Sequence, residues 1–328
     1  MVDQDKLPVV AVDAMGGDIG PSAVVPGVVD ALSETSGYSV ALYGDKDSIQ
    51  TELNKLDCSS LPISIVHCTQ AIDMGDSPAS AVKGKPDSPI VKAMTDHKAG
   101  IVSAVMSAGS TGAMVAASLM ILGRLSSVKR PGIATVIPTS GKPFVMLDSG
   151  ANVQATPEHL ETFAKMGDTY CKSILGNENP TIGLLNIGEE PSKGSELTVA
   201  SHKLLAESNL NFIGNIESKQ LPYGPVDVLV TDGFTGNIVL KMVEGFGALL
   251  IKILSGSSDS KSDDKSAMLE KMDYSSTGGA MLLGVKGSPI ICHGASNSRA
   301  IKSALVIASR LALVDLPTKL EECLSNSN

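Results

Sequence analysis

Two short loops in the sequence repeat one arrangement of small residues, glycine and threonine. They read Ser107-Ala108-Gly109-Ser110-Thr111-Gly112-Ala113 and Thr231-Asp232-Gly233-Phe234-Thr235-Gly236-Asn237. Each follows an apolar run typical of a buried strand and precedes an apolar helical pattern. Glycine lets the backbone approach an anion, a helix start presents free N–H groups, and threonine adds a hydroxyl. The pair predicts an anion site, and a glycine-rich turn with a threonine cap is the alternative explanation.

Further polar segments follow other predicted strands. They are Asp13–Asp18, Leu147–Asn152, Asn186–Gly194 and Cys292–Ser296. Ligands of open α/β sheets bind at the carboxyl ends of strands, so these segments are candidates for the same site. The first segment lacks a GxGxxG fingerprint, and a tight turn with aspartate caps also explains it. His293 fits a structural role as well as a catalytic one.

One lysine stands where a helix is expected to begin. Pro191 is a favoured first-turn residue, so the helix predicted over 192–207 places Lys193 in its first turn. A cation there opposes the helix dipole, which points to a role such as holding phosphate. A solvated surface lysine is the alternative.

The candidate phosphate- and substrate-binding residues all come from these strand-end segments. They are Gly16, Gly17, Asp18, Ser107, Gly109, Ser110, Thr111, Gly112, Asp148, Asn152, Asn186, Glu189, Asp232, Gly233, Thr235, Gly236 and Ser296. No HExxH or paired-cysteine spacing indicates a metal, and no Walker A or GxSxG pattern occurs. The sequence therefore predicts no metal and no cofactor.

Composition excludes several classes of function. The chain has 328 residues, of which 43% are hydrophobic and 3% aromatic, and its net charge is -9. An acidic chain poor in aromatics is a poor nucleic-acid binder. Its five cysteines are scattered without a CxxC pair, which favours reduced thiols and a cytoplasmic location. The N-terminal segment lacks the pattern of a signal peptide, and the uninterrupted apolar runs are shorter than a membrane span.

The pattern of elements predicts a doubly wound α/β fold with a mixed, mostly parallel sheet and helices on both faces. Strands are predicted at 8–14, 39–43, 63–67, 101–106, 133–138, 144–147, 181–186, 212–215, 226–231 and 289–292. Helices are predicted at 22–35, 47–55, 88–97, 111–124, 157–175, 192–207, 236–254 and 298–313. A tight turn at 139–142 predicts one antiparallel hairpin. We expect a single domain over 1–328, with a protruding helical arm near 246–275.

Taken in order, these segments resemble the bacterial phosphate acyltransferases of phospholipid synthesis, the PlsX family. The matching stretches are VAVDAMGGDIGP, MSAGSTGAMVA, PGIATVIPT, LDSGAN, IGLLNIGEEPSKG, NFIGNIE, DVLVTDGFTGNIVLK, GGAMLLGVKG and CHGAS, and together they cover nearly the whole chain. The chain departs from the family at Ser110, where asparagine is common, at Ser149, where the family has an apolar residue, and over 74–83, where glutamate and arginine are usual. These departures bear on details of substrate contact.

The resemblance implies a fold similar to phosphotransacetylases and isocitrate dehydrogenases, usually as a homodimer. It implies transfer of a long-chain acyl group from acyl-[acyl carrier protein] to inorganic phosphate. The acyl phosphate would then serve a glycerol-3-phosphate acyltransferase that makes phosphatidic acid. In this hypothesis the glycine-threonine loops bind phosphate with Lys193 as counter-charge. Asn237 donates to the acyl oxygen, and His293 protonates the leaving sulfur or binds phosphate.

The helical arm has two open explanations. Leu249, Leu250, Ile251, Leu254, Met268, Leu269 and Met272 could form an apolar tip at a membrane surface, as the family's peripheral membrane association implies, or a dimer interface. Nearby lysines could form a patch for the acidic carrier protein, and they are Lys241, Lys252, Lys261, Lys265 and Lys271.

Three other functions remain as alternatives. One is a phosphotransacetylase for short acyl-CoA, which makes the same bond changes with a different donor. Another is a metal- and NAD-dependent hydroxyacid dehydrogenase, which the few arginines disfavour. The third is a non-enzymatic scaffold at the membrane.

Overall fold

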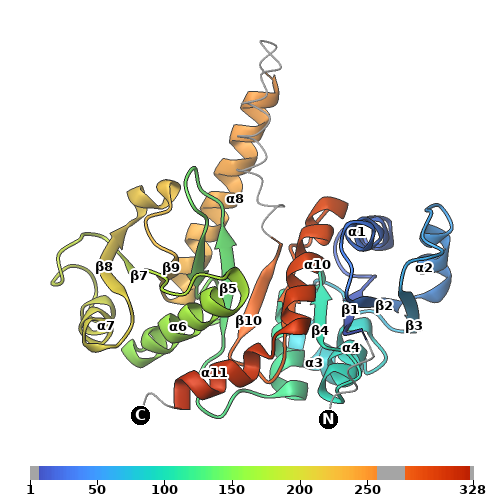
Figure 1. Ribbon diagram of the computed structural model, residues 1–328, viewed down its shortest axis with the longest axis horizontal. Coiled ribbons are helices and arrows are strands. Elements are labelled where there is room, and N and C mark those ends of the chain that lie inside the picture. The colour runs from blue at the N-terminus through green and yellow to red at the C-terminus, as the bar shows by residue number, and fades with distance from the viewer. Residues whose placement is uncertain (1–6, 257–277, 326–328) are drawn as a thin grey trace. The chain divides into compact units, whose positions relative to one another are not determined.

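The computed structural model describes residues 7–256 and 278–325 (Figure 1). These residues form two compact units. The first comprises Met1–Leu125 with Gly278–Pro317, and the second Ser126–Thr277 with Thr318–Asn328. The helix α11 (Leu316–Ser325) begins at the end of the first unit, and most of its residues belong to the second.

The first unit contains a mostly parallel sheet. Its strands stand in the order β3 (Ile63–His67), β2 (Ser39–Gly44), β1 (Val9–Asp13), β4 (Ala104–Ser107), β11 (Pro289–Ile291) and β10 (Ala280–Leu283). Neighbouring strands are parallel, except that β10 runs antiparallel to β11. β1 is apolar and buried along nearly its whole length, as a strand covered on both faces must be.

Helices cover both faces of this first sheet. They are α1 (Pro21–Glu34), α2 (Lys46–Leu53), α3 (Pro78–Gly84), α4 (Pro89–Lys98), α5 (Thr111–Ala117) and α10 (Ser298–Leu313), and a π-turn at Ser118–Leu122 continues α5. α10 packs on α1, and α4 packs on α5, while α10 and α4 both contact β1 and β4. Two helices that share the same strands but pack with different partners lie on opposite faces.

The second unit has its own sheet, in the order β5 (Gly132–Ile137), β6 (Phe144–Leu147), β9 (Val228–Val230), β7 (Ile182–Asn186) and β8 (Phe212–Glu217). β5 and β6 form the antiparallel hairpin predicted from the sequence, and the other pairs are parallel. The hairpin turn is held by Thr139, whose hydroxyl accepts the N–H of Gly141 and donates to the carbonyl of Lys142.

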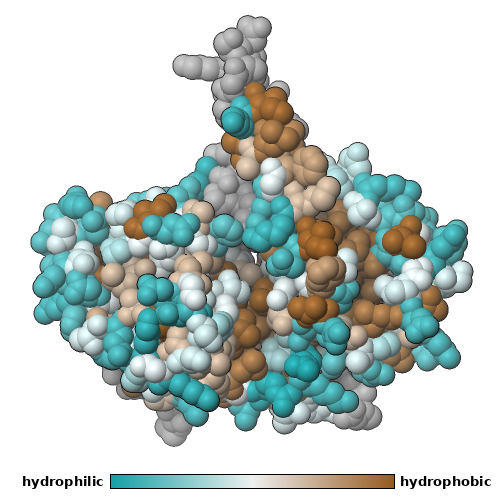
Figure 2. Space-filling model, turned by 180° about the vertical axis from the view of Figure 1, so that it is seen from behind, coloured by the Kyte–Doolittle hydropathy of each residue, from teal (hydrophilic) through white to brown (hydrophobic). Residues whose placement is uncertain are grey.

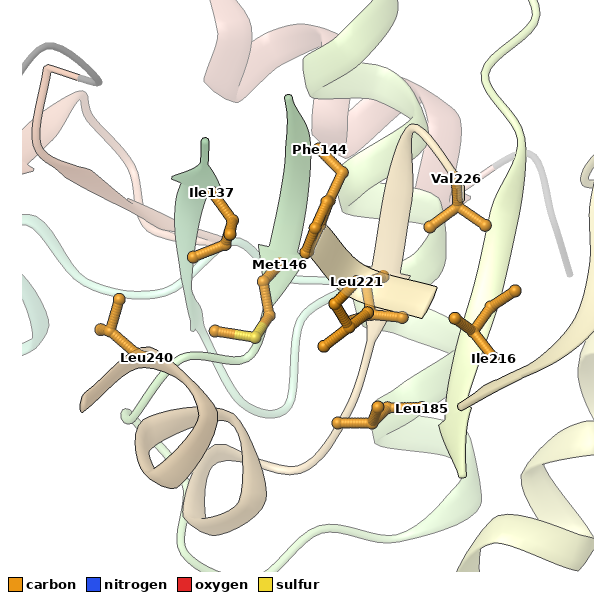
Figure 3. Packing of buried hydrophobic residues seen from close by; sticks show 9 residues of the cluster. Ile137, Phe144, Met146, Leu185, Ile216, Leu221, Val226 and Leu240 are labelled. Carbon is orange, nitrogen blue, oxygen red and sulfur yellow. The ribbon is translucent and has the colours of Figure 1, made fainter. Parts of the chain in front are cut away.

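The helices of the second unit also flank their sheet. They are α6 (Pro157–Tyr170), continued by a π-turn at Cys171–Leu175, α7 (Glu196–Glu207), a 3-10 turn at Ser218–Tyr223, and α8 (Gly233–Gly256). α6 contacts α7, β6 and β9. On the α8 side, Leu240 closes a core built by the strands and the 3-10 turn (Figure 3). That core contains Ile137, Phe144, Met146, Leu185, Ile216, Leu221, Val226 and Leu229.

The architecture confirms the predicted fold class of a mixed, mostly parallel sheet with helices. One predicted helix start, that of 192–207, is wrong. α7 begins at Glu196, with Ser195 as its N-cap, and Lys193 therefore lies outside the helix. The sequence also missed β10, α3 and α11. The expected arm near 246–275 is described only as far as Gly256, and its remainder lies outside the described residues.

Candidate active site

In the first unit, three predicted segments lie together because their strands are parallel neighbours. The segments follow β1, β4 and β11, whose carboxyl ends meet at one edge of the sheet. The N–H of Asp18 donates to the carbonyl of Gly294 at 2.8 Å, joining the segments after β1 and β11. A Cβ at Gly16 would lie 2.7 Å from the nitrogen of Gly109, so the segments after β1 and β4 are in contact.

A buried carboxylate connects two of these segments. Asp13, the last residue of β1, is 4% exposed. Its Oδ2 accepts the hydroxyl of Ser107 at 2.7 Å, and its Oδ1 accepts the N–H of Met15 at 3.0 Å. The hydroxyl of Ser107 in turn accepts the N–H of Gly109 at 2.9 Å. Burial raises the pKa of Asp13, and the hydrogen bond from Ser107 opposes that rise.

The first glycine-threonine loop opens onto α5. Ser110 is the N-cap, and its hydroxyl accepts the N–H of Ala113 at 3.3 Å. Thr111 is exposed at the start of the helix. Gly112 packs so closely on Pro78 that a Cβ there would lie 2.6 Å from the proline ring, which ties the loop to α3.

The segment after β11 carries the candidate histidine. His293 is exposed, and its Nδ1 accepts the N–H of Ala295 at 3.1 Å. Its carbonyl accepts the N–H of Ser296, so the segment is a tight turn. Gly17 stands at φ +88, a left-handed conformation that glycine adopts readily, and packs against the carbonyl of Gly294. His293 is thereby held beside Asp18 at the same edge.

The second unit repeats this arrangement after β6, β9 and β7, which are also parallel neighbours. Asp148 is fully buried at the end of β6. Its Oδ1 accepts the N–H groups of Ile133, Gly150 and Ala151, and its Oδ2 accepts the N–H and the side-chain amide of Asn152, all within 3.0 Å. Asp148 therefore shapes its loop from within.

The second glycine-threonine loop packs directly on that segment. The N–H of Gly233 donates to the carbonyl of Asn152 at 2.9 Å. Asp232 accepts both the N–H and the hydroxyl of Thr235, at 2.9 and 2.7 Å, as a helix cap does. Asn237 is exposed, and its amide donates to the carbonyl of Ser149 at 3.2 Å. A carboxamide has two N–H groups, so this bond orients the second one.

The segment after β7 is a loop rather than the predicted helix start, because side chains occupy its backbone groups. The Oδ1 of Asn186 accepts the N–H of Ile187, and its amide donates to the carbonyl of Lys193, both at 2.9 Å. The amide of Asn215, on β8, donates to the carbonyl of Glu190. Lys193 is exposed between these anchors. The Oε1 of the exposed Glu189 accepts from Gln220 at 3.2 Å.

Each unit thus presents a set of backbone N–H groups, a glycine-threonine loop and an exposed polar side chain at one sheet edge. Such a set suits an oxyanion or phosphate more than a cation. From the sequence, Asp13 belonged to a candidate segment but was not counted among the binding residues, and Asn215 was not singled out. A carboxylate at the last position of a buried strand was the signal for Asp13, whereas nothing local marked Asn215, whose Oδ1 is buried without a hydrogen-bond partner.

Among the described residues, no group of three or more His, Cys, Asp or Glu side chains is placed to hold a metal. In the same part of the chain, one helix, Gly233–Ile253, has the length and hydropathy of a membrane span, and little of it is buried. An apolar helix that is covered by a partner can have the same length and hydropathy.

Comparison with known proteins gives a full-length match. The model of the fatty acid synthesis protein family matches residues 9–319. A phosphate acyltransferase of Desulforamulus reducens is 43% identical over 326 residues, covering 97% of each chain. One of Moorella thermoacetica is 45% identical over 330 residues, covering 95% of this chain and 97% of the relative.

Solved structures agree on the fold. A phosphotransacetylase from Streptococcus pyogenes superposes with a TM-score of 0.64 at 17% identity, covering 93% of this chain and 94% of that one. A branched-chain phosphotransacylase from Enterococcus faecalis V583 gives 0.62 at 15% identity, covering 93% and 99%. Fold and site thus define an α/β protein that has the fold of phosphotransacylases. From its family match and relatives, the chain belongs to the fatty acid synthesis protein family, the PlsX family of phosphate acyltransferases, and it is an acyltransferase enzyme.

Proposed function

We propose that the protein transfers a long-chain fatty acyl group from acyl-[acyl carrier protein] to inorganic phosphate. The product, an acyl phosphate, would feed a glycerol-3-phosphate acyltransferase in phosphatidic acid synthesis. The observation that carries the proposal is the nearly full-length similarity to curated phosphate acyltransferases. The paired glycine-threonine loops, each at the carboxyl edge of a sheet, supply the anion-binding groups that this reaction needs.

The reaction places modest demands on the protein. An oxygen of phosphate attacks the thioester carbonyl, the C–O bond forms, the C–S bond breaks, and the sulfur leaves as a thiolate that takes up a proton. Phosphate is already an anion at neutral pH, and the thiolate of a thiol with a pKa of about 8.5 is a good leaving group. Catalysis is therefore mainly placement of two reactants, worth about 7–11 kcal/mol, and stabilisation of the tetrahedral oxyanion.

The exposed polar side chains divide these tasks in the proposal. The loops bind phosphate, with Lys193 as counter-charge. Asn237, oriented by its bond to Ser149, donates its second N–H to the oxyanion. His293 protonates the departing sulfur or binds phosphate. Its Nδ1 accepts the N–H of Ala295, so in the neutral ring Nε2 carries the proton that this proposal assigns to the sulfur or the phosphate.

The proposed partners follow from the surface of α8. Its exposed apolar side chains form a stripe on which a second copy or a membrane surface could pack, and Figure 2 shows hydrophobic surface on this helix. Lys241 and Lys252, on the same helix, are exposed and could meet an acidic carrier protein. The other lysines of that predicted patch lie outside the described residues. The proposed location is the cytoplasm, with peripheral contact at the inner face of the membrane.

The first experiment mixes purified protein with palmitoyl-[acyl carrier protein] and phosphate, without metal or nucleotide. Acyl phosphate and free carrier thiol are both assayed. We expect equal amounts of the two, and no thiol release when phosphate is left out. Thiol release without acyl phosphate would show a thioesterase instead, and no reaction would contradict the proposed donor.

A second candidate is transfer from a short-chain acyl-CoA. The observation that favours it is the fold shared with phosphotransacetylases. Running the same assay with acetyl-CoA and palmitoyl-CoA separates the two candidates. A kcat/KM for acetyl-CoA above that for palmitoyl-[acyl carrier protein] would favour this second function.

A further inference from the structure

The buried carboxylate of Asp13 has no role in the acyl-transfer steps above. We propose that Asp13 is a positioning residue which, through Ser107, holds the first glycine-threonine loop in the conformation that aligns the substrates. The inference rests on the proposed acyl transfer to phosphate, and it changes the expected role of Ser107 from substrate contact to positioning.

The hydrogen bonds form a directional chain. An ionised carboxylate has no proton to give, so the hydroxyl of Ser107 must donate to Asp13, over 2.7 Å. The lone pairs of that hydroxyl then accept the N–H of Gly109, over 2.9 Å. One buried charge thereby fixes the rotamer of Ser107 and the peptide plane at the start of the loop.

The same carboxylate also shapes the segment that follows β1. It accepts the N–H of Met15, and a Cβ at Gly16 would lie 2.8 Å from its Oδ2 and 2.7 Å from the nitrogen of Gly109. The two strand-end segments therefore touch across Asp13. A change at Asp13 therefore reaches both of them.

If the hydrogen bond between Asp13 and Ser107 only held the fold together, a neutral side chain could replace the carboxylate. Burying a carboxylate costs free energy unless hydrogen bonds satisfy it. Asp148 in the second unit is satisfied by five donors from its own surroundings. Asp13 instead accepts a hydroxyl from a neighbouring strand, and charge-assisted bonds of this kind are stronger and more directional than neutral ones.

Two titratable groups close to Asp13 stay neutral in the assay range. Tyr43 is its partner in the register of β2, and burial raises the pKa of that phenol. Cys68 interacts electrostatically with Asp13, and burial raises the pKa of its thiol to about 11. Titration of the Asp13 carboxylate is thus separable from that of both neighbours.

The test compares Asp13→Asn, Ser107→Ala and the double variant. We expect kcat/KM to fall about tenfold or more in each single variant, the effect of losing about 1.4 kcal/mol of transition-state alignment. The double variant should be no worse than the poorer single one, because both changes break the same bond. Ser107→Thr, which keeps the hydroxyl, should recover activity relative to Ser107→Ala.

The matched control is Asp96→Asn. Asp96 also accepts a hydroxyl, that of Tyr43 at 2.7 Å, but it belongs to α4 and not to a strand-end segment. Its removal should leave turnover unchanged. Equal losses in Asp96→Asn and Asp13→Asn would overturn the proposal, because they would show a general cost of removing a carboxylate.

Two readouts separate positioning from loss of stability. The ratio of wild-type to Asp13→Asn activity should shrink as the pH falls through the pKa of Asp13, since a protonated carboxyl resembles the amide, and taking the ratio cancels the titration of phosphate. Hydrogen exchange at Gly109 should be faster in Asp13→Asn. A constant ratio with unchanged exchange would refute the inference. If wild type transfers no acyl group from any donor, the proposed function fails, and the exchange experiment still decides whether Asp13 holds the loop.

Discussion

At the scale of single residues, two carboxylates end buried strands and are used differently. Asp148 accepts mainly from N–H groups of its own loop and once from Ile133 on β5, whereas Asp13 accepts the hydroxyl of Ser107 on a neighbouring strand. Both stand at the last positions of apolar runs, so the sequence predicted that the segments mattered. The sequence could not show that Ile133 donates to Asp148 or that Ser107 donates to Asp13, because these donors lie 15 and 94 positions away in the chain.

Asn237 gives the first prediction. Its amide is oriented by the carbonyl of Ser149, which leaves one N–H to stabilise the oxyanion. We expect Asn237→Ala to lower kcat by about 100-fold, the usual cost of losing an oxyanion donor. Steady-state kinetics with saturating phosphate measure this. Asn209→Ala, at an exposed asparagine after α7, is the control. A loss smaller than about threefold would remove Asn237 from the oxyanion site.

Lys193 gives a second prediction. Its backbone is fixed by Asn186, and its exposed side chain extends past Gly188. If the ammonium is the counter-charge for phosphate, Lys193→Ala should raise KM for phosphate about tenfold, since a charge-assisted contact is lost. Lys203→Ala, at an exposed lysine of α7, should leave KM unchanged. Normal KM and normal kcat in Lys193→Ala would show that Lys193 has no part in phosphate binding.

At the scale of elements, hydrophobic runs predicted most strands and helices well, and the failures have local causes. Pro191 suggested a helix start, but Asn186 and Asn215 bind the backbone of that segment, and α7 begins only at Glu196, after its N-cap Ser195. β10 is a run of Ala, Met and Leu, which have high helix propensity, and it is a strand because it pairs with β11. α3 has only seven residues, too few for a helical period to show.

His97 connects two elements and gives a prediction about pH. At the end of α4, its Nδ1 donates to the carbonyl of Val102, and its Nε2 accepts the N–H of Ser288, just before β11, at 2.9 Å. Burial lowers the pKa of His97, because the charged ring would be desolvated, and the hydrogen bond to Val102 opposes that fall. The unfolded chain, with a pKa near about 6.5, then binds the proton first as the pH falls.

That order of protonation decides how the stability contribution of His97 changes with pH. The contribution of His97 to the free energy of unfolding is complete above about pH 6.5 and is lost as the pH falls from there through the lower folded-state pKa. Urea unfolding of wild type and His97→Gln should therefore show a stability difference that shrinks in acid. A difference independent of pH would contradict the assignment.

At the scale of the whole molecule, alternating strand and helix patterns predicted the mixed, mostly parallel fold correctly, because continuous apolar strands require cover on both faces. The apolar face of α8 was harder to interpret. Exposed large side chains recur along it at spacings of three or four residues. They are Phe234, Ile238, Met242, Phe246, Leu249, Leu250 and Ile253. The helical period in the sequence marks such a face, but says nothing of what covers it.

The proposed homodimer makes the last prediction. Exposure of a contiguous apolar stripe to water is unfavourable, so we expect a partner to bury it. Met242 and Phe246 are 58% and 54% exposed and lie one turn apart in the middle of the stripe. The double change to glutamate places two charges there, and sedimentation should then show monomers where wild type sediments as a dimer. Lys241→Glu, on the same turn, is the charge control and should keep the dimer.

Lipid is the competing cover for this stripe, and liposome flotation separates the two. Leu249 and Ile253 lie farther along α8, toward the part of the expected arm that is not described, and the predicted contacts of Met268, Leu269 and Met272 lie outside the described residues. If lipid covers the far end, Leu249→Glu with Ile253→Glu should abolish flotation while the dimer persists. Loss of the dimer in both double variants, with unchanged flotation, would assign the whole stripe to a second copy. If both double variants keep the dimer and the flotation, some other partner covers α8.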